Sequence, residues 1–181
     1  MKYPIGIQSF DQIIEGNCGY VDKTDLVYRL VTTTKTCFLS RPRRFGKSLL
    51  VSTLDAYFKG RKELLDGLMI AKLEKDWHQY PVFKIDFNGV NFTEKGNLEA
   101  TIEYYLANWE KIYGETPREV PLGKRFEQIL SLAYQQTGRR AVVLVEEYDK
   151  PILDALDTPL EDANREILKA FYSTFKGADE Y

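Results

Sequence analysis

The segment Arg41-Pro-Arg-Arg-Phe-Gly-Lys-Ser48 constrains this chain more than any other part of its sequence. It follows a short β-rich run at residues 36–40 (TCFLS), and Leu50, Leu54 and Phe58 recur after it at helical spacing. The pattern predicts a strand, a loop and a helix in that order. A loop at a helix N-terminus can turn successive backbone N–H groups towards a phosphate, and the helix dipole favours the anion.

Three residues of this loop have defined chemical roles in phosphate binding. Gly46 allows a close backbone approach, Lys47 reaches the β- and γ-phosphates, and the Ser48 hydroxyl ligates magnesium. Arg41 occupies the position of the first glycine in the usual pattern G-x-x-x-x-G-K-[ST]. ATP and Mg²⁺ are the predicted ligands, and the alternative is a basic surface turn with an incidental Gly-Lys pair. The predicted nucleotide-binding residues are Arg44, Phe45, Gly46, Lys47, Ser48 and Leu49.

A second candidate lies where the apolar run at residues 141–145 (AVVLV) meets Glu146 and Glu147. Such a run is typical of a strand that is covered on both faces. A magnesium-dependent NTPase needs a carboxylate near the metal and a group that orients the attacking water. We therefore predict Glu146 as a metal ligand and Glu147 as the catalytic residue. The alternative is a strand that simply ends in solvent.

The remaining patterns alternate helices with strands. Residues 24–31 read as a helix capped by Asp22 or Thr24, and residues 82–87 read as a strand. Later helices are indicated by apolar stripes at Leu98, Ile102, Leu106, Trp109 and Ile112, at Phe126, Ile129, Leu130 and Ala133, and at Ile167, Leu168, Phe171 and Phe175. Asp149 can cap a helix whose first turn contains Pro151. This order predicts an α/β, three-layer P-loop NTPase fold with a mostly parallel sheet, which binds ligands at the carboxyl ends of its strands.

Two polar or aromatic groups outside these motifs have a structural interpretation that is favoured over a functional one. For Asp86, the exit of an edge strand is favoured over a place in the site. For Tyr104, Tyr105, Trp109 and Tyr113, core packing is favoured over base stacking.

Length and composition set further bounds. The 181 residues suffice for one domain over 1–181, with 1–35 as lead-in helices. A net charge of −2 gives no general attraction to nucleic acid. His78 is the only histidine, which excludes a multi-histidine metal site, and Cys18 and Cys37 lack metal-ligand spacing. Without an apolar run long enough for a signal peptide or a membrane span, a cytoplasmic location is expected.

Four segments together resemble the bacterial AAA-ATPase-like proteins: YVDKT at 20–24, RPRRFGKSLL at 41–50, PVFKID at 81–86, and the run 142–151 that ends in EYDKP. The resemblance covers nearly the whole chain and assigns Lys47 to phosphate, Ser48 to metal and Glu147 to water orientation. Arginine at position 41 is usual in that family. Glu146 departs from it, because aspartate is usual there.

The resemblance also implies partners and an extent. Members often carry a C-terminal nuclease-like domain of the PD-(D/E)XK superfamily, and they continue into a further strand with a polar sensor residue. The chain therefore looks like a fragment with an incomplete sheet, for which impaired ATPase activity is expected.

Three functions remain open at this point. One is a hydrolysing switch whose homo-oligomer supplies an arginine in trans. Another is a non-hydrolysing nucleotide sensor, which Glu146 and the early C-terminus favour. The third is a nucleic-acid module, suggested by Arg43, Arg44 and the nuclease-linked family.

Overall fold

The computed structural model describes residues 2–42, 44–178 and 180–181. The chain divides into two compact units, Met1–Tyr80 (unit 1) and Pro81–Tyr181 (unit 2). Each unit has its own hydrophobic core and is described here by itself. The expected single domain over 1–181 therefore stays a prediction.

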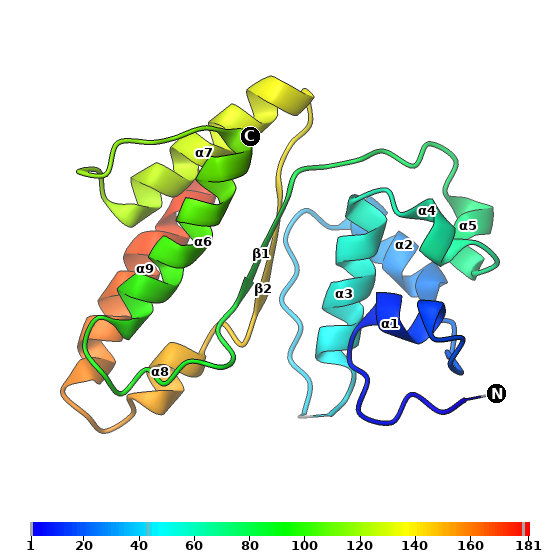
Figure 1. The fold of residues 1–181 in the computed structure, drawn as a ribbon, viewed down its shortest axis with the longest axis horizontal. Coiled ribbons are helices and arrows are strands. Elements are labelled where there is room, and N and C mark those ends of the chain that lie inside the picture. Colours follow the sequence, from blue (N-terminus) through cyan, green and yellow to red (C-terminus); the bar gives the residue numbers. More distant parts are fainter. Residues whose placement is uncertain (1, 43, 179) are drawn as a thin grey trace. The chain divides into compact units, whose positions relative to one another are not determined.

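Unit 1 is built from helices (Figure 1). They are α1 (Phe10–Glu15), α2 (Thr24–Thr33), α3 (Lys47–Phe58), α4 (Lys62–Leu65) and α5 (Met69–Leu73). The predicted helices at 24–31 and after residue 46 are confirmed. Their apolar faces meet in a small core that consists of Phe10, Val27, Ala56, Leu64, Leu65 and Ile70.

The start of α2 is fixed by side chains of the YVDKT segment. Asp22 Oδ1 accepts hydrogen bonds from the backbone N–H of Thr24 (2.9 Å) and from its hydroxyl (2.7 Å). Asp22 Oδ2 accepts from Met69 N at 2.7 Å, and Thr24 Oγ1 accepts from Ile70 N at 3.0 Å. Burial acts to raise the pKa of Asp22, but the bonds from Thr24 and Met69 outweigh it and lower that pKa. Asp22 and Thr24 thus satisfy N–H groups at the starts of both α2 and α5.

The predicted strand at residues 36–40 is wrong. The segment between α2 and α3 has no strand hydrogen bonds, and the Phe38 side chain is 66% exposed. A strand needs a neighbouring strand to pair with its backbone groups. The described residues of unit 1 contain helices and one isolated bridge, between Lys2 and Cys18, so segment 36–40 has no such neighbour there.

Unit 2 contains a parallel pair of strands, β1 (Val82–Asp86) and β2 (Val142–Glu146). The register pairs Val82 with Val142 at one end and Asp86 with Glu146 at the other. Both strands were predicted, and the long connection between them contains α6 (Asn97–Tyr113) and α7 (Leu122–Thr137). The α/β class is thereby confirmed, with a small two-stranded parallel sheet, and the three-layer P-loop fold stays a prediction.

Two more helices complete unit 2, α8 (Lys150–Asp154) and α9 (Leu160–Gly177). Helices α6, α7 and α9 lie alongside one another on one side of the strand pair (Figure 1). Their core is rich in aromatic rings and contains Phe83, Ile85, Phe87, Phe92, Leu98, Ile102, Leu106, Trp109, Phe126, Ile129, Leu130, Ala133, Leu168 and Phe171.

The strand faces differ in burial. Phe83 and Ile85 of β1 are buried in this core, and Val143 and Val145 of β2 pack against it. Residues 142–145 are all half-buried, so within unit 2 this strand is covered on one face, and the predicted coverage of both faces stays a prediction. A pair of strands with helices on one side leaves the second face without a covering layer among the described residues of unit 2.

The helical stripes are confirmed except at Ile112, and in the aromatic group of α6 the expected core packing fails at Tyr104. Ile112 was expected in the core, but its side chain is 66% exposed. Tyr104 was expected to pack in the core, but it is 65% exposed. Position 112 lies in the last turn of α6, three residues beyond the buried Trp109, and its neighbour Tyr113 is the residue of that turn that packs against the core.

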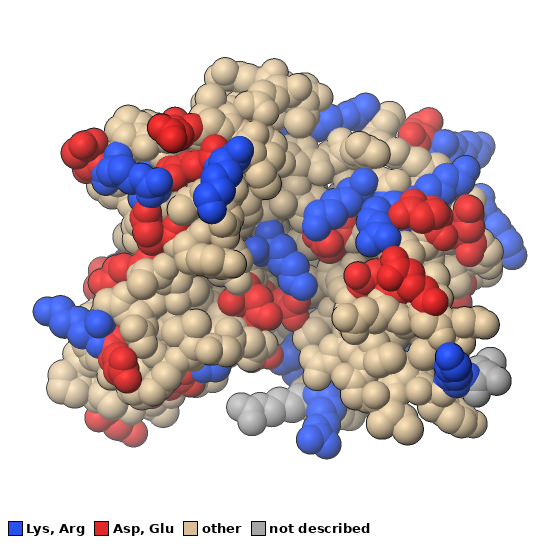
Figure 2. Space-filling view, in the orientation of Figure 1, with Lys and Arg blue, Asp and Glu red and all other residues tan. Residues whose placement is uncertain are grey.

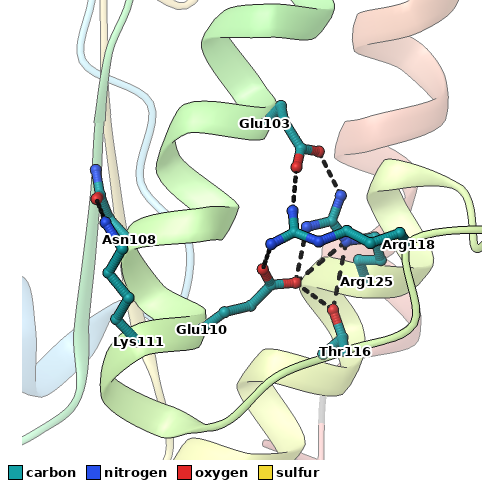
Figure 3. A network of polar contacts seen from close by, with 7 residues as sticks. All are labelled: Glu103, Asn108, Glu110, Lys111, Thr116, Arg118 and Arg125. Carbon is teal, nitrogen blue, oxygen red and sulfur yellow. Dashed lines mark hydrogen bonds and ion pairs between the residues drawn. The ribbon is translucent and has the colours of Figure 1, made fainter.

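A buried ion cluster joins α6 and α7 (Figure 3). The Arg125 side chain is 2% exposed, and its guanidinium lies 2.7 Å from the Glu110 carboxylate. Arg118 lies 3.1 Å from the other Glu110 oxygen. Glu103 contacts both arginines, and the Thr116 hydroxyl donates to Glu110. Burial acts to raise the pKa of Glu110, but the bonds from Thr116 and Arg125 outweigh it and lower that pKa.

Candidate functional site

The loop before α3 ends in a glycine with a left-handed backbone. Gly46 has a φ of 74° and a ψ of 25°, and α3 begins at the next residue, Lys47. A Cβ built on Gly46 would meet nothing within 4 Å, so the left-handed backbone, and not crowding, makes glycine the suitable residue there. Arg44 also has a positive φ, of 67°. The loop thus makes a tight reversal directly into a helix N-terminus.

The side chains of this loop are accessible. Lys47 and Ser48 are half-buried in the first turn of α3, whereas Arg44 and Phe45 are exposed. The first N–H groups of a helix have no acceptor within that helix. The first turn of α3 therefore combines open backbone donors with the Lys47 ammonium and the Ser48 hydroxyl.

Arg41 helps to explain how the loop forms without a glycine at its start. Its guanidinium donates a long hydrogen bond, 3.4 Å, to the carbonyl of Phe45. The Phe45 N–H in turn donates to the Pro42 carbonyl at 3.4 Å. These two hydrogen bonds, both between residues of the loop, close it around Arg44. Arg43, which the sequence set beside Arg44 as a source of positive charge, lies outside the described residues.

Helix α3 is anchored on α1. The Ser52 hydroxyl accepts a hydrogen bond from the Phe10 N–H at 2.9 Å and donates to the Leu49 carbonyl at 3.0 Å. Leu49, predicted as part of the nucleotide-binding set, packs against the core of unit 1. Its side chain therefore holds the helix, and only its backbone N–H can serve a ligand.

The acidic strand end has a distinct geometry in unit 2. Glu146 closes β2 and is 8% exposed, and its Oε1 lies 2.8 Å from the Lys84 ammonium of β1. Glu147 is half-buried and has a φ of 50°. A non-glycine residue rarely adopts that backbone, and such residues are frequent at functional sites. The turn continues into α8 through a bond from Lys150 N to the Glu147 carbonyl, at 2.9 Å.

Lys84 is the residue that sequence reasoning missed. Positions 82, 84 and 86 of β1 share one face of the strand pair with 142, 144 and 146 of β2. Lys84 therefore points to the same face as Glu146. The alternation within PVFKID was the available signal, but without the register the two residues could not be paired.

Other motif residues have structural partners. Asp149 occupies the N-cap position of α8, as predicted, although its side chain makes no cap bond. Lys150 donates to the Val90 carbonyl at 2.8 Å, pairs with Asp154, and lies 5.3 Å from the centre of the Phe92 ring. Burial, followed by the charge of Asp149, raises the pKa of Tyr172, so its protonated hydroxyl can donate to the Tyr148 carbonyl at neutral pH.

The two candidate regions lie in different units. The phosphate loop belongs to unit 1 and the acidic strand end to unit 2. The predicted meeting of Lys47 with Glu146 and Glu147 therefore stays a prediction, as do the individual site assignments. Among the described residues, no group of three or more His, Cys, Asp or Glu side chains could hold a metal ion by itself.

The charged surface shows no strong preference for a polyanion. On the face seen in Figure 2, lysine and arginine side chains are interspersed with aspartate and glutamate, and no broad area of one sign is seen. Within the part of the chain that the structure describes, no helix is long and apolar enough to cross a membrane.

Comparison with known proteins adds a family. The model of a family described as "Predicted AAA-ATPase" (AAA-ATPase-like) matches residues 4–181. An "uncharacterized protein in vnfD 5′region" of Azotobacter chroococcum mcd 1 is 40% identical over 185 residues, which cover 99% of this chain and 35% of the relative. The chain thus spans about a third of that relative's length. No solved structure matches the chain.

Proposed function

The chain belongs to the predicted AAA-ATPase-like family, and from this premise we propose that it binds ATP with Mg²⁺ at the loop that ends in Gly46-Lys47-Ser48. Membership supports a nucleotide-binding, ATPase-like function at a coarse level. The observation that carries the finer proposal is the left-handed Gly46 directly before α3, with Lys47 and Ser48 in the first helical turn. Backbone N–H groups at such a terminus favour a phosphate.

Each site residue has a proposed role. Lys47 neutralises the β- and γ-phosphates, while the backbone from Arg44 to Leu49 surrounds them. Ser48 and Glu146 supply the oxygen ligands that Mg²⁺ prefers. The ion, when bound, shields phosphate charge. Glu147 orients the water for attack, and its unusual backbone supports a functional role.

The resident ion pair between Lys84 and Glu146 favours the sensor as the second candidate. An ammonium 2.8 Å from the carboxylate competes with a metal for the same oxygen. Glu146 must either break its ion pair with Lys84, or contact the ammonium and the metal together, before it can ligate Mg²⁺. This competition weakens metal binding and turnover but leaves phosphate binding at α3 unaffected.

Partners beyond nucleotide belong to the proposal as well. A three-layer P-loop fold, a homo-oligomer that supplies an arginine in trans, and a C-terminal nuclease-like domain in a longer chain would all follow from the family resemblance. Binding to nucleic acid is the least supported of the three functions, because charges of both signs alternate over the face seen in Figure 2.

Nucleotide binding and phosphate release test these functions on the same proteins. Lys47→Ala should weaken binding of a fluorescent ATP analogue at least about tenfold, because it removes a charge-assisted contact to phosphate. Lys59→Ala is the matched control, since Lys59 directly follows α3 and its exposed side chain pairs with Asp55. Equal effects of the two substitutions, or no binding by the unmodified chain, would contradict the proposal.

Hydrolysis is separated from sensing by Glu147→Gln. Release of phosphate by the unmodified chain, lost in Glu147→Gln with binding retained, supports the hydrolysing switch. Binding without release in both proteins supports the sensor. Lys84→Met should increase the apparent affinity for Mg²⁺ if Lys84 competes for Glu146, and unchanged affinity would exclude that competition.

A further inference from the structure

A pocket of about 440 Å³, lined by both polar and apolar side chains, lies in unit 2, between the end of β1 and α6. Its lining residues all belong to unit 2, and no residue of the proposed nucleotide site is among them. The wall from the strand end carries Asp86 and Asn88, and the wall from α6 carries Asn97, Thr101, Tyr104 and Tyr105. These α6 positions recur at spacings of three and four, so they form one helical face.

Several hydrogen-bond donors of this pocket are already used. Asn97 Nδ2 donates to the Asn91 carbonyl at 2.7 Å, and the Thr101 hydroxyl donates to the Asn97 carbonyl at 2.7 Å. The Tyr105 hydroxyl donates to the Asp86 carbonyl at 2.9 Å and accepts from the Asp86 N–H at 3.0 Å. The Thr101 and Tyr105 hydroxyls therefore have no proton left for a ligand, and Asn97 has used one of its two amide N–H groups.

The acceptors of the pocket are not used to the same extent. One Asp86 carboxylate oxygen accepts from Asn88 N at 2.9 Å, and no other partner of that carboxylate occurs among the residues that the structure describes. The Asn97 amide oxygen and the lone pairs of the Thr101 hydroxyl are further acceptors. A ligand that fits this wall is rich in donors.

Charge and shape narrow the ligand class. Asp86 supplies a negative charge, and the nearest lysine on its own strand face, Lys84, is paired with Glu146. The Tyr104 ring stands largely exposed at the same pocket. A guanidinium group is planar, carries five N–H donors and stacks on aromatic faces, whereas an ammonium is a compact and strongly hydrated charge.

We propose that the pocket between Asp86 and Tyr104 binds a guanidinium group, with the Asp86 carboxylate and the Asn97 and Thr101 oxygens as acceptors and Tyr104 as the stacking surface. The same chemistry occurs in an arginine side chain of a protein and in a free guanidino compound. An exposed tyrosine, which the sequence pattern assigned to the core, thereby has a binding role.

The test is a titration of the full 181-residue, isotope-labelled chain, followed by NMR chemical shifts. N-acetyl-arginine amide should shift the signals of residues 86–90 and 97–105. N-acetyl-citrulline amide has nearly the same shape without the charge, and it should bind at least about tenfold more weakly. Free arginine, which carries an α-carboxylate, separates the sources: weaker binding than the amide indicates a peptide-borne arginine, and equal or tighter binding indicates a free compound.

Variants locate the site. Asp86→Asn keeps an acceptor for the Asn88 N–H and should reduce affinity at least about tenfold. Glu99→Gln removes the same charge from α6 outside the pocket wall and should leave affinity unchanged. Tyr104→Leu alters an exposed ring, so it preserves the fold and should also weaken binding.

Several results would overturn the inference: equal binding of the citrulline or the N-acetyl-lysine amide, equal effects of Asp86→Asn and Glu99→Gln, or signal changes outside the pocket. Lys47→Ala should bind the arginine amide as the unmodified chain does. Failure of the nucleotide proposal and failure of this one are therefore distinguishable.

Discussion

Units 1 and 2 differ in the strands, the hydrophobic core and the buried ion pairs that each contains. Unit 2 contains both strands, the larger aromatic core and the buried ion cluster around Arg125. Unit 1 contains short helices around a smaller core, and its exposed segment 36–40 forms no strand. The candidate phosphate loop is in the unit with the smaller core, and the acids are in the unit with the larger one. A helix or strand predicted from the sequence pattern is found in the structure where the residues that pair or pack with it belong to the same unit.

Each unit has one tryptophan, Trp77 in unit 1 and Trp109 in unit 2, so their unfolding can be followed separately. With one tryptophan replaced by phenylalanine, the fluorescence of the other reports the unfolding of its own unit. The predictions below use this pair of reporters.

The largest effect is expected for Arg125→Met. The substitution leaves Glu110 buried with Arg118 as its remaining ion partner, and it should lower the free energy of unfolding of unit 2 by about 3–5 kcal/mol. Denaturant unfolding followed by Trp109 measures the loss. Arg165→Met removes an exposed pair with Glu161 and should cost at most about 1 kcal/mol. If both substitutions cost the same, the cluster does not stabilise unit 2.

Gly46→Ala should destabilise unit 1 by about 1–2 kcal/mol, because alanine resists the left-handed backbone. The Trp77 transition should move, and the Trp109 transition should not. Ser48→Ala, two residues later and inside the helix, is the control and should leave the unfolding of unit 1 nearly unchanged. A Gly46→Ala protein as stable as the control would show that the loop does not need its left-handed glycine.

Asp22 should make the stability of unit 1 depend on pH. Its pKa is lower in the folded chain than the value of about 3.9 in unfolded chains. Its contribution is therefore present above that unfolded value and is lost as the pH falls through the folded pKa. Asp22→Asn should cost about 1 kcal/mol at pH 7, through the weakened cap, and should flatten the acid limb of the Trp77 transition.

Glu110 has a lowered pKa as well, so the acid limb of the Trp109 transition should persist in Asp22→Asn. If the substitution flattens both limbs or neither, Asp22 does not act on unit 1 through its carboxylate. The comparison of the two tryptophans thus serves as the internal control.

The smallest effect is expected for Ile112→Lys. The side chain is exposed at the end of α6, so the substitution should change the stability of unit 2 by no more than about 0.5 kcal/mol. Leu106→Ala on the buried face of the same helix should cost about 2–5 kcal/mol. A large loss from Ile112→Lys would restore the expectation that Ile112 belongs to the core.

The sequence predicts elements well where the apolar period is long and the partners are near. Helices 97–113 and 122–137 follow from their stripes, and the parallel strands follow from their short apolar runs. Segment 36–40 failed because three apolar residues in a row do not specify a neighbouring strand. The contacts that join distant residues, such as Lys84 with Glu146 and Arg125 with Glu110, depend on register and helix packing, which periodicity does not encode.

For the candidate site, the sequence correctly predicted the loop-to-helix junction. The start of α3 at Lys47 and the left-handed Gly46 agree with the Gly-Lys-Ser motif. The roles of Lys47, Ser48, Glu146 and Glu147 remain predictions, because they depend on groups from two units meeting around one ligand. Side-chain chemistry alone could not indicate that Glu146 already has a cationic partner.

That partner has a consequence for handling the protein. A buried carboxylate needs either a proton or a positively charged partner, and Glu146 has such a partner in the Lys84 ammonium of the neighbouring strand. Chelators should therefore leave the fold intact, and metal-free preparations should remain stable on storage. In the proposed site magnesium would compete with Lys84 for Glu146, so a change in the reactivity of Lys84 towards acetylating reagents would report metal occupancy without any measurement of turnover.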